Sequence, residues 1–111
     1  MKVPTRVPEK GFYYHYKHDP AGPINAYAYE MVDVGIHTEA ADEEEDANMV
    51  IYRPLYKEAF SYRAGKFLDL RPLEMWMGDV TKDGKTFPRF KKITDASVIT
   101  ELEAIKKELY D

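Results

Sequence analysis

At 111 residues, with a formal net charge of -4, the chain has room for one domain and a single hydrophobic core. It contains no cysteine, which excludes disulfides, iron–sulfur clusters, thiolate zinc sites and a cysteine nucleophile. The start, MKVPTRVPEK, lacks the apolar run of a signal peptide, and no apolar segment approaches the roughly 20 residues that span a bilayer. We therefore expect a soluble, cytoplasmic protein with no membrane partner.

Residues 11–17, GFYYHYK, predict a strand because large side chains alternate between two faces. One face takes Phe12, Tyr14 and Tyr16, and the other takes Tyr13, His15 and Lys17. Residues 18–25, HDPAGPIN, hold two prolines and a glycine and predict a loop.

Residues 26–37 predict a long strand with apolar side chains on both faces, which indicates a central place in the sheet. Its two faces are expected to carry Val32, Val34 and Ile36, and Met31, Asp33 and His37. The following acidic loop, residues 39–48, carries six carboxylates: Glu39, Asp42, Glu43, Glu44, Glu45 and Asp46. Between residues 53 and 92, ten lysines and arginines stand against five acidic residues, so the body of the chain is mildly basic.

Residues 49–56, MVIYRPLY, resume the β pattern, and Pro54 indicates an edge or a bulge because it cannot donate to a ladder. Residues 57–66 predict a connection that turns at Gly65. In the next motif, RPLEMW, Leu73 and Met75 are two positions apart, so both are expected to face the core, while Glu74 and Trp76 are expected to face elsewhere.

Asp83-Gly84 predicts a hairpin with a type I′ turn, its second strand ended by Pro88. The last segment, residues 94–110, predicts a helix capped by Thr94 or Asp95. Its apolar stripe is Val98, Leu102, Ile105 and Leu109. We expect this stripe to pack on the strands or on another subunit.

Several short strands followed by one helix predict a mainly β fold, a small barrel with a C-terminal α-helix. The whole chain, residues 1–111, is expected to be a single domain, with a β-barrel core over residues 11–93 and the helix over residues 94–111. A closed or nearly closed barrel hides its strand edges, so function is expected in the loops at its rim.

Five motifs stand in order between residues 11 and 90. They are Gly11-x-Tyr13-x-His15-Tyr16-Lys17, His37-Thr38-Glu39, Tyr52-Arg53-Pro54-Leu55-Tyr56, Arg71-Pro72-Leu73-Glu74-Met75-Trp76, and Asp83-Gly84-Lys85 with Pro88-Arg89-Phe90. This series resembles the bacterial domain-of-unknown-function family 1653, whose members read approximately GxYxHYK, HSE, VYRALY, RPLEMF and DGKxxPRF. The resemblance implies an SH3-like barrel and carries no assigned activity.

The chain departs from that family pattern in several places. Trp76 stands where members have Phe, and Thr38 stands where they have Ser. The loops over residues 19–26, 40–48 and 58–66 look longer than in the family, and the C-terminal helix lies beyond the shared region. Longer loops would reshape the rim of a site, so a relative's ligand would be a weak guide.

Charged and aromatic side chains within these motifs form the candidate ligand site. They are His15, Tyr16, Lys17, His37, Glu39, Tyr52, Arg53, Arg71, Glu74, Trp76 and Arg89. If the strand ends meet at one rim, the arginines and aromatic rings would suit an anionic or planar ligand. The competing interpretation is structural: Arg71 pairs with Glu74 or Glu39, and the histidines satisfy backbone groups.

Among the possible functions, the aromatic residues favour ligand recognition through aromatic rings. The chain holds nine tyrosines, and rings are spread over the motif strands at Tyr14, Tyr16, Tyr52, Tyr56 and Trp76. Aromatic-lined grooves bind peptides and nucleic acids, although core packing also uses such rings. We expect about half of these rings to be structural.

Other chemistries are less well supported. His15 and His18 have HxxH spacing, but an extended strand points them to opposite faces, so no metal site is expected. No dinucleotide or phosphate-loop motif is present, and no cofactor is expected.

The sequence favours a small binding module for an anionic small molecule, a peptide or a nucleotide-like ligand over an enzyme. An enzyme acting on a small or nucleotide-like substrate through His37 and Glu39 is the alternative, and single-stranded nucleic-acid binding is a third. Association of two copies through the C-terminal helix also stays open.

Overall fold

The computed structural model describes residues 4–39 and 47–111, so the predicted acidic residues from Asp42 to Asp46 lie outside the described residues. The elements follow one another as β1 (Gly11–His15), β2 (Ala28–Ile36), β3 (Asn48–Pro54), α1 (Phe60–Arg63), β4 (Asp69–Pro72), α2 (Leu73–Met77), β5 (Asp79–Lys82), β6 (Lys85–Pro88), β7 (Phe90–Lys92) and α3 (Ala96–Tyr110). The predicted mainly β fold with a C-terminal helix is confirmed.

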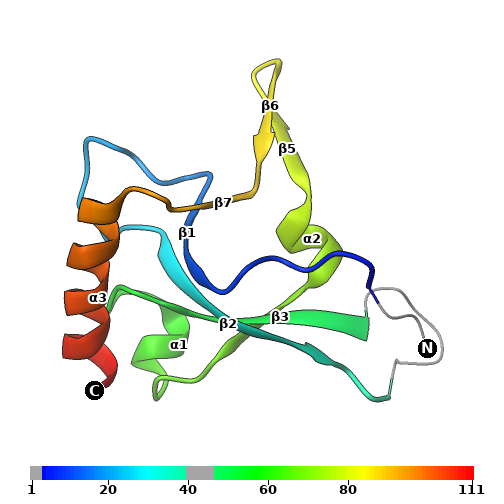
Figure 1. Ribbon diagram of the computed structural model, residues 1–111, viewed down its shortest axis with the longest axis horizontal. Helices are drawn as coiled ribbons and strands as arrows, with labels where there is room; N and C mark the ends of the chain where they lie inside the picture. Colours follow the sequence, from blue (N-terminus) through cyan, green and yellow to red (C-terminus); the bar gives the residue numbers. More distant parts are fainter. Residues whose placement is uncertain (1–3, 40–46) are drawn as a thin grey trace.

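Five strands form one antiparallel sheet in the order β4-β3-β2-β1-β7, while β5 and β6 pair only with each other and project from it (Figure 1). Within the described ranges β4 and β7 are the outer strands of this sheet, so the predicted closed barrel is not observed. These two strands have only four and three residues, and Pro72 in β4 has no N–H to donate, which limits further pairing. The SH3-like description stays a prediction.

The hairpin between β5 and β6 turns where the sequence predicted. Asp83 has a φ of 53° and Gly84 a φ of 76°, and two successive positive φ angles are typical of a type I′ turn. The strand that follows ends at Pro88, as expected. The turn chemistry of these two residues therefore determined the local structure.

The central strand β2 contains a bulge that the sequence did not indicate. The register with β3 shifts between Met31, which faces Tyr52, and Asp33, which faces Ile51. The extra residue, Val32, moves Val34 onto the same side as Met31, where it packs against the same core. The predicted sharing of one face by Val32 and Val34 is therefore wrong.

The motif RPLEMW folds into a strand end followed by the short helix α2, not into an extended strand. Leu73 and Trp76, three positions apart, are both buried, while Met75 is 45% exposed. The prediction that Met75 faces the core and Trp76 faces elsewhere is wrong because the helical period replaces the strand period here.

Each face of the sheet carries its own hydrophobic core. The first core, on the side of α2, consists of Tyr13, Met31, Val50, Tyr52, Leu73, Trp76 and Phe90. The second consists of Phe12, Ala28, Leu55, Ile93 and Leu102. The alternation predicted for residues 11–17 is confirmed where Phe12 and Tyr13 enter opposite cores.

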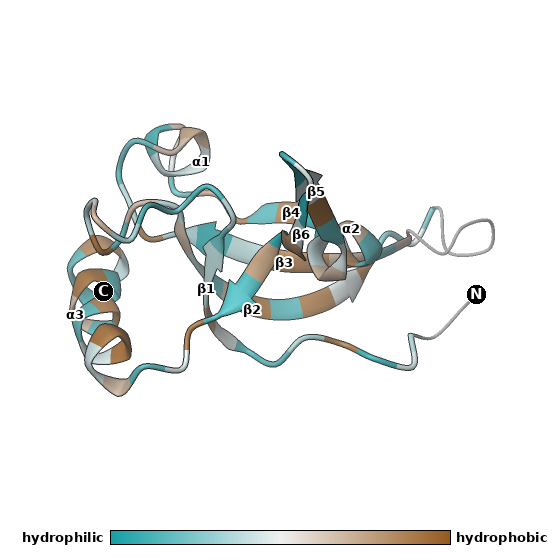
Figure 2. Cartoon of the chain, turned by 90° about the horizontal axis from the view of Figure 1, so that it is seen from above, coloured by the Kyte–Doolittle hydropathy of each residue, from teal (hydrophilic) through white to brown (hydrophobic). Residues whose placement is uncertain are grey.

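Helix α3 closes the second core at one end of the sheet, away from α2 (Figure 2). Its predicted stripe is confirmed, since Leu102 and Leu109 are buried and Val98 and Ile105 pack against the second core. Asp95 caps the helix by accepting hydrogen bonds from the backbone N–H groups of Ser97 and Val98. The helix packs on the strands, one of the two placements that the sequence allowed.

Replacing Leu102 tests how strongly α3 is bound to the sheet. Leu102 is fully buried, so Leu102→Ala should lower the free energy of unfolding by about 3 kcal/mol, measured by urea denaturation. Glu103→Ala, an exposed change one position along the helix, should leave it nearly unchanged. Equal effects of the two substitutions would contradict the packing described here.

Candidate functional site

The predicted site residues separate into groups that do not all meet. His15 ends β1 beside the start of β2, since Tyr14 pairs with Ala28. His37 and Glu39 follow the other end of β2 and are exposed. A nine-residue strand extends roughly 25 Å, so these two residues do not join His15. Within residues 4–39 and 47–111, no catalytic partner is placed beside His37 and Glu39, and the predicted His37/Glu39 enzyme stays a prediction.

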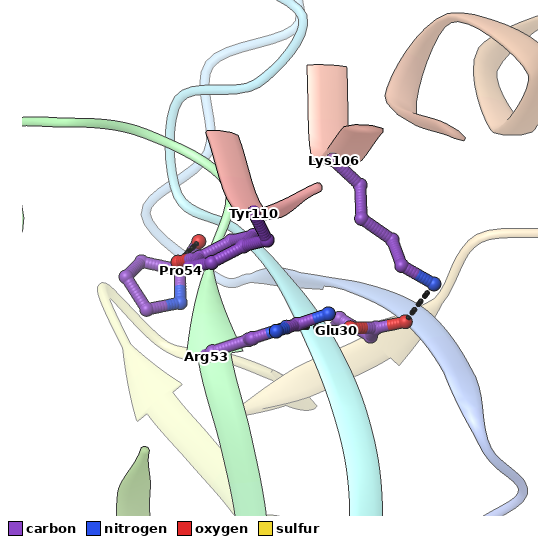
Figure 3. Close-up of polar contacts among 5 residues, drawn as sticks. All are labelled: Glu30, Arg53, Pro54, Lys106 and Tyr110. Atoms are coloured by element: carbon purple, nitrogen blue, oxygen red, sulfur yellow. Dashed lines mark hydrogen bonds and ion pairs between the residues drawn. The ribbon is translucent and has the colours of Figure 1, made fainter. Parts of the chain in front are cut away.

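Arg53 points to the opposite side of the sheet from Tyr52 and joins α3 to the strands (Figure 3). Its Nε donates to Glu30 Oε1 at 2.8 Å, and Lys106 Nζ donates to Glu30 Oε2 at 2.7 Å. The guanidinium also lies 4.1 Å from the ring centroid of Tyr110. This set has the geometry of a structural network.

Tyr110 completes that network from the end of α3. Its hydroxyl donates to the backbone oxygen of Pro54 (Figure 3). Burial raises the pKa of Tyr110 to about 12, so the hydroxyl keeps its proton and remains a donor at neutral pH. The hydrogen bond that Lys106 donates to Glu30 raises the pKa of Lys106, which keeps that amine charged.

Removing the carboxylate tests this network. Glu30→Ala leaves the charges of Arg53 and Lys106 close together without their acceptor and should cost about 1–3 kcal/mol in the free energy of unfolding. Asp33→Ala breaks the ion pair between Lys10 and Asp33, whose side chains are 68% and 61% exposed, and should leave the free energy of unfolding nearly unchanged. Urea denaturation measures both; a Glu30 variant as stable as the Asp33 variant would contradict the structural role.

On the other face, seven side chains form a continuous group that we call the Arg71 cluster. Its members are His15, Tyr27, Tyr29, Tyr52, Tyr56, Arg71 and Phe90. They come from β1, β2, β3, β4 and β7 and from the segments beside them, so the sheet brings together residues far apart in the sequence.

Arg71 lies over aromatic rings. Its guanidinium carbon is 5.2 Å from the ring centroid of Phe90 and 5.8 Å from that of Tyr52. Its Nε donates to the Tyr52 hydroxyl at 3.3 Å, and its Nη1 contacts Met75 Sδ at 3.5 Å. The Asp69 carboxylate interacts electrostatically with Arg71 as well. The pairing of Arg71 with Glu74 or Glu39, which the sequence offered as an alternative, stays a prediction.

His15 is held neutral in this cluster. Burial is the main cause that lowers its pKa to about 4, and the positive charges of Arg71, Lys17 and Arg89 add to it. The backbone N–H of Lys17 donates to its Nδ1 at 3.2 Å, so we assign the remaining proton to Nε2. The imidazole therefore brings a hydrogen-bond donor without a charge.

Tyr29 and Tyr56 add two hydroxyls, which hydrogen bond to each other. Burial is the main cause that raises the pKa of both, so both remain protonated near neutral pH. The candidate list from the sequence left out Tyr27, Tyr29, Tyr56 and Phe90, although Tyr56 was named among the rings for aromatic recognition. The alternation of Tyr27, Tyr29 and Met31, just before and within β2, was the available signal for the first two.

The remaining predicted residues have different surroundings. Trp76 is 1% exposed and stacks on Phe90, with ring centroids 3.8 Å apart, so it supports the cluster from within the core. Tyr16 and Lys17 lie just beyond β1, Tyr16 half-buried and Lys17 exposed, and Glu74 is exposed on α2. Arg89 has a buried Nε that finds no hydrogen-bond acceptor among the described residues.

Two properties of the described residues concern metal binding and membrane insertion. In the ranges 4–39 and 47–111, no three histidine or carboxylate side chains stand close enough together to hold a metal ion. No helix in the same ranges has the length and apolar character needed to cross a membrane.

A family model described as a protein of unknown function, DUF1653, matches residues 11–92. The chain belongs to the DUF1653 family. The matched region contains every strand of the sheet and every member of the Arg71 cluster, while α3 lies outside it. No curated protein and no solved structure matches the chain. The DUF1653 match therefore supports the family resemblance seen in the sequence and adds no ligand.

The neutral state of His15 has a consequence for stability against pH. Because its folded-state pKa of about 4 lies below the ordinary value of 6.5, the unfolded chain takes up a proton first as the pH falls. Stability is therefore lost between about pH 6.5 and about pH 4, and His15→Phe should lose less over this interval. Urea denaturation at about pH 7 and about pH 5 measures the difference; equal losses in both proteins would show that His15 is not held neutral.

Proposed function

We propose that this protein is a small binding module whose Arg71 cluster takes an anionic small molecule, within the cytoplasmic setting that the absence of cysteine suggested. One observation carries the proposal: the partly buried Arg71 side chain lies over two aromatic rings, in a cluster that also holds a neutral imidazole donor and tyrosine hydroxyls. Holding a cation in this way has a desolvation cost, which an anionic ligand would offset.

The groups around Arg71 suit a carboxylate or a phosphate. A guanidinium can donate two parallel hydrogen bonds to either group, which gives orientation as well as affinity. His15 offers its Nε2–H as a neutral donor, and one of the two protonated hydroxyls of Tyr29 and Tyr56 is left to donate after they hydrogen bond to each other. The Asp69 carboxylate interacts electrostatically with Arg71 and Tyr56, so a bound anion would compete with it.

The test measures binding of inorganic phosphate, citrate and ribose 5-phosphate by calorimetry at low salt. Arg71→Gln should weaken the affinity for the phosphate compounds by about tenfold or more, because a charge-assisted hydrogen bond is lost. Arg71→Lys keeps the charge but not the paired donors, so its affinity should lie between those of wild type and Arg71→Gln. Arg63→Gln, an exposed arginine at the end of α1, is the matched control and should bind as wild type does.

Two results would overturn the proposal. One is unchanged affinity in an Arg71→Gln protein that circular dichroism shows to be folded. The other is a wild-type protein that binds none of the three compounds at millimolar concentration. Equal losses in the Arg71 and Arg63 variants would show only a general effect of net charge and would also count against the site.

A further inference from the structure

A pocket of about 370 Å³ opens beside the Arg71 cluster and shares His15 with it. Its walls are Tyr14, His15, Tyr16, His18, Phe87 and Lys91, with Pro88 next to Phe87. The volume lies within the range of small-molecule sites, and the lining is mostly aromatic, as such sites commonly are.

The walls come from two parts of the chain. Tyr14 and Tyr16 belong to β1 and its extension, whereas Phe87 belongs to β6 of the separate hairpin. The Tyr16 and Phe87 rings lie 5.7 Å apart between centroids, and Tyr14 stacks on His18 at 3.6 Å. The Tyr14 hydroxyl donates to the backbone oxygen of Ile24 at 2.6 Å, which fixes that wall.

The two histidines of the pocket have opposite hydrogen-bond characters. His18 Nδ1 lies 2.7 Å from the carbonyl oxygen of Ala26, which can only accept, so His18 carries its proton on Nδ1. In the neutral ring its Nε2 is then an acceptor. His15 is the reverse, with Nδ1 accepting from Lys17 N–H and Nε2 carrying the proton. The pocket thus has one ring nitrogen that donates and one that accepts.

We propose that this pocket binds a flat heteroaromatic ring of the nucleobase type. Aromatic walls favour stacking of such a ring, and the Nε2 acceptor of His18 matches a hydrogen-bond donor on its edge, while the single Nε2–H of His15 stays available for the phosphate. The pocket adjoins the Arg71 cluster because the His15 ring lies 5.1 Å from Phe90, over which Arg71 lies at 5.2 Å. Resting on the proposed function, the ligand class is a nucleotide, with its ring in the pocket and its phosphate at Arg71.

The experiment compares four probes by calorimetry: adenosine 5′-monophosphate, uridine 5′-monophosphate, adenosine and ribose 5-phosphate. A monophosphate should bind wild type at least about tenfold more tightly than ribose 5-phosphate, which lacks the ring. Phe87→Ala should remove this advantage and leave the affinity for ribose 5-phosphate unchanged. Phe87→Tyr keeps a ring and should retain monophosphate binding.

Phe60→Ala is the matched control, since Phe60 is 80% exposed on α1 and does not line the pocket. It should bind all four probes as wild type does.

A short oligoadenylate distinguishes a free nucleotide from single-stranded nucleic acid, because both ligands carry a base and a phosphate. If the oligoadenylate binds with the same affinity as adenosine 5′-monophosphate, the ligand is a free nucleotide. If it binds more tightly, with an affinity that falls steeply with salt, the ligand is a single strand.

Failure of the ring site and failure of the anion site give different results. Equal affinities for the monophosphates and ribose 5-phosphate, or unchanged monophosphate binding in a folded Phe87→Ala protein, overturn the ring site and leave the anion site standing. Adenosine binding that depends on Phe87, without any binding of ribose 5-phosphate, supports the ring site and overturns the anion site. Absence of binding to every probe overturns both.

Discussion

Trp76 of α2 lies flat on Phe90 of β7, with ring centroids 3.8 Å apart and planes within 6° of each other. Tyr13 and Tyr52 pack against the same indole, so the stack connects α2, β1, β3 and β7 in one contact. Arg71 lies over the same Phe90 ring. The first core and the base of the Arg71 cluster therefore depend on one pair of rings, and a change that tilted Phe90 would disturb both.

Two arginines show how the sheet separates structural and candidate functional roles. Arg53 and its neighbour Tyr52 leave β3 on opposite sides, as successive residues of a strand must. Arg53 meets the Glu30 carboxylate and helps bind α3, while Arg71 follows the side of Tyr52 and lies over rings. Their chemistry is the same, and the face on which each lies determines whether its guanidinium joins α3 to the sheet or lies over the rings of the first core.

Short-range patterns in the sequence predicted much of this fold. Alternation in residues 11–17, the Asp83-Gly84 turn and the stripe through Leu102 all report local geometry, and each is present in the structure. The bulge at Val32 and the helical turn after Pro72 were missed because each changes the period within a few residues. The open sheet was missed because closure depends on how distant strands pair, which local patterns do not report.

The candidate site was predictable to a similar extent. The sequence predicted Arg71 and His15 as site residues because ionisable residues are unusual within apolar motifs. The structure places both in one cluster. His37 was grouped with them because strand ends were assumed to meet at one rim, whereas β2 holds it at the far end. Phe90 and Tyr29 were missed because an aromatic residue in a strand looks the same in sequence whether it fills a core or supports a charge.

The place of α3 has a consequence for how the family can diversify. The helix covers Phe12, Ala28, Leu55 and Ile93, yet it lies outside the family match and contributes nothing to the Arg71 face. A relative without this helix has to cover those four side chains by another segment or a partner, or replace them with polar ones. The back of the sheet can therefore be covered differently in different relatives without a change to the Arg71 cluster on the front.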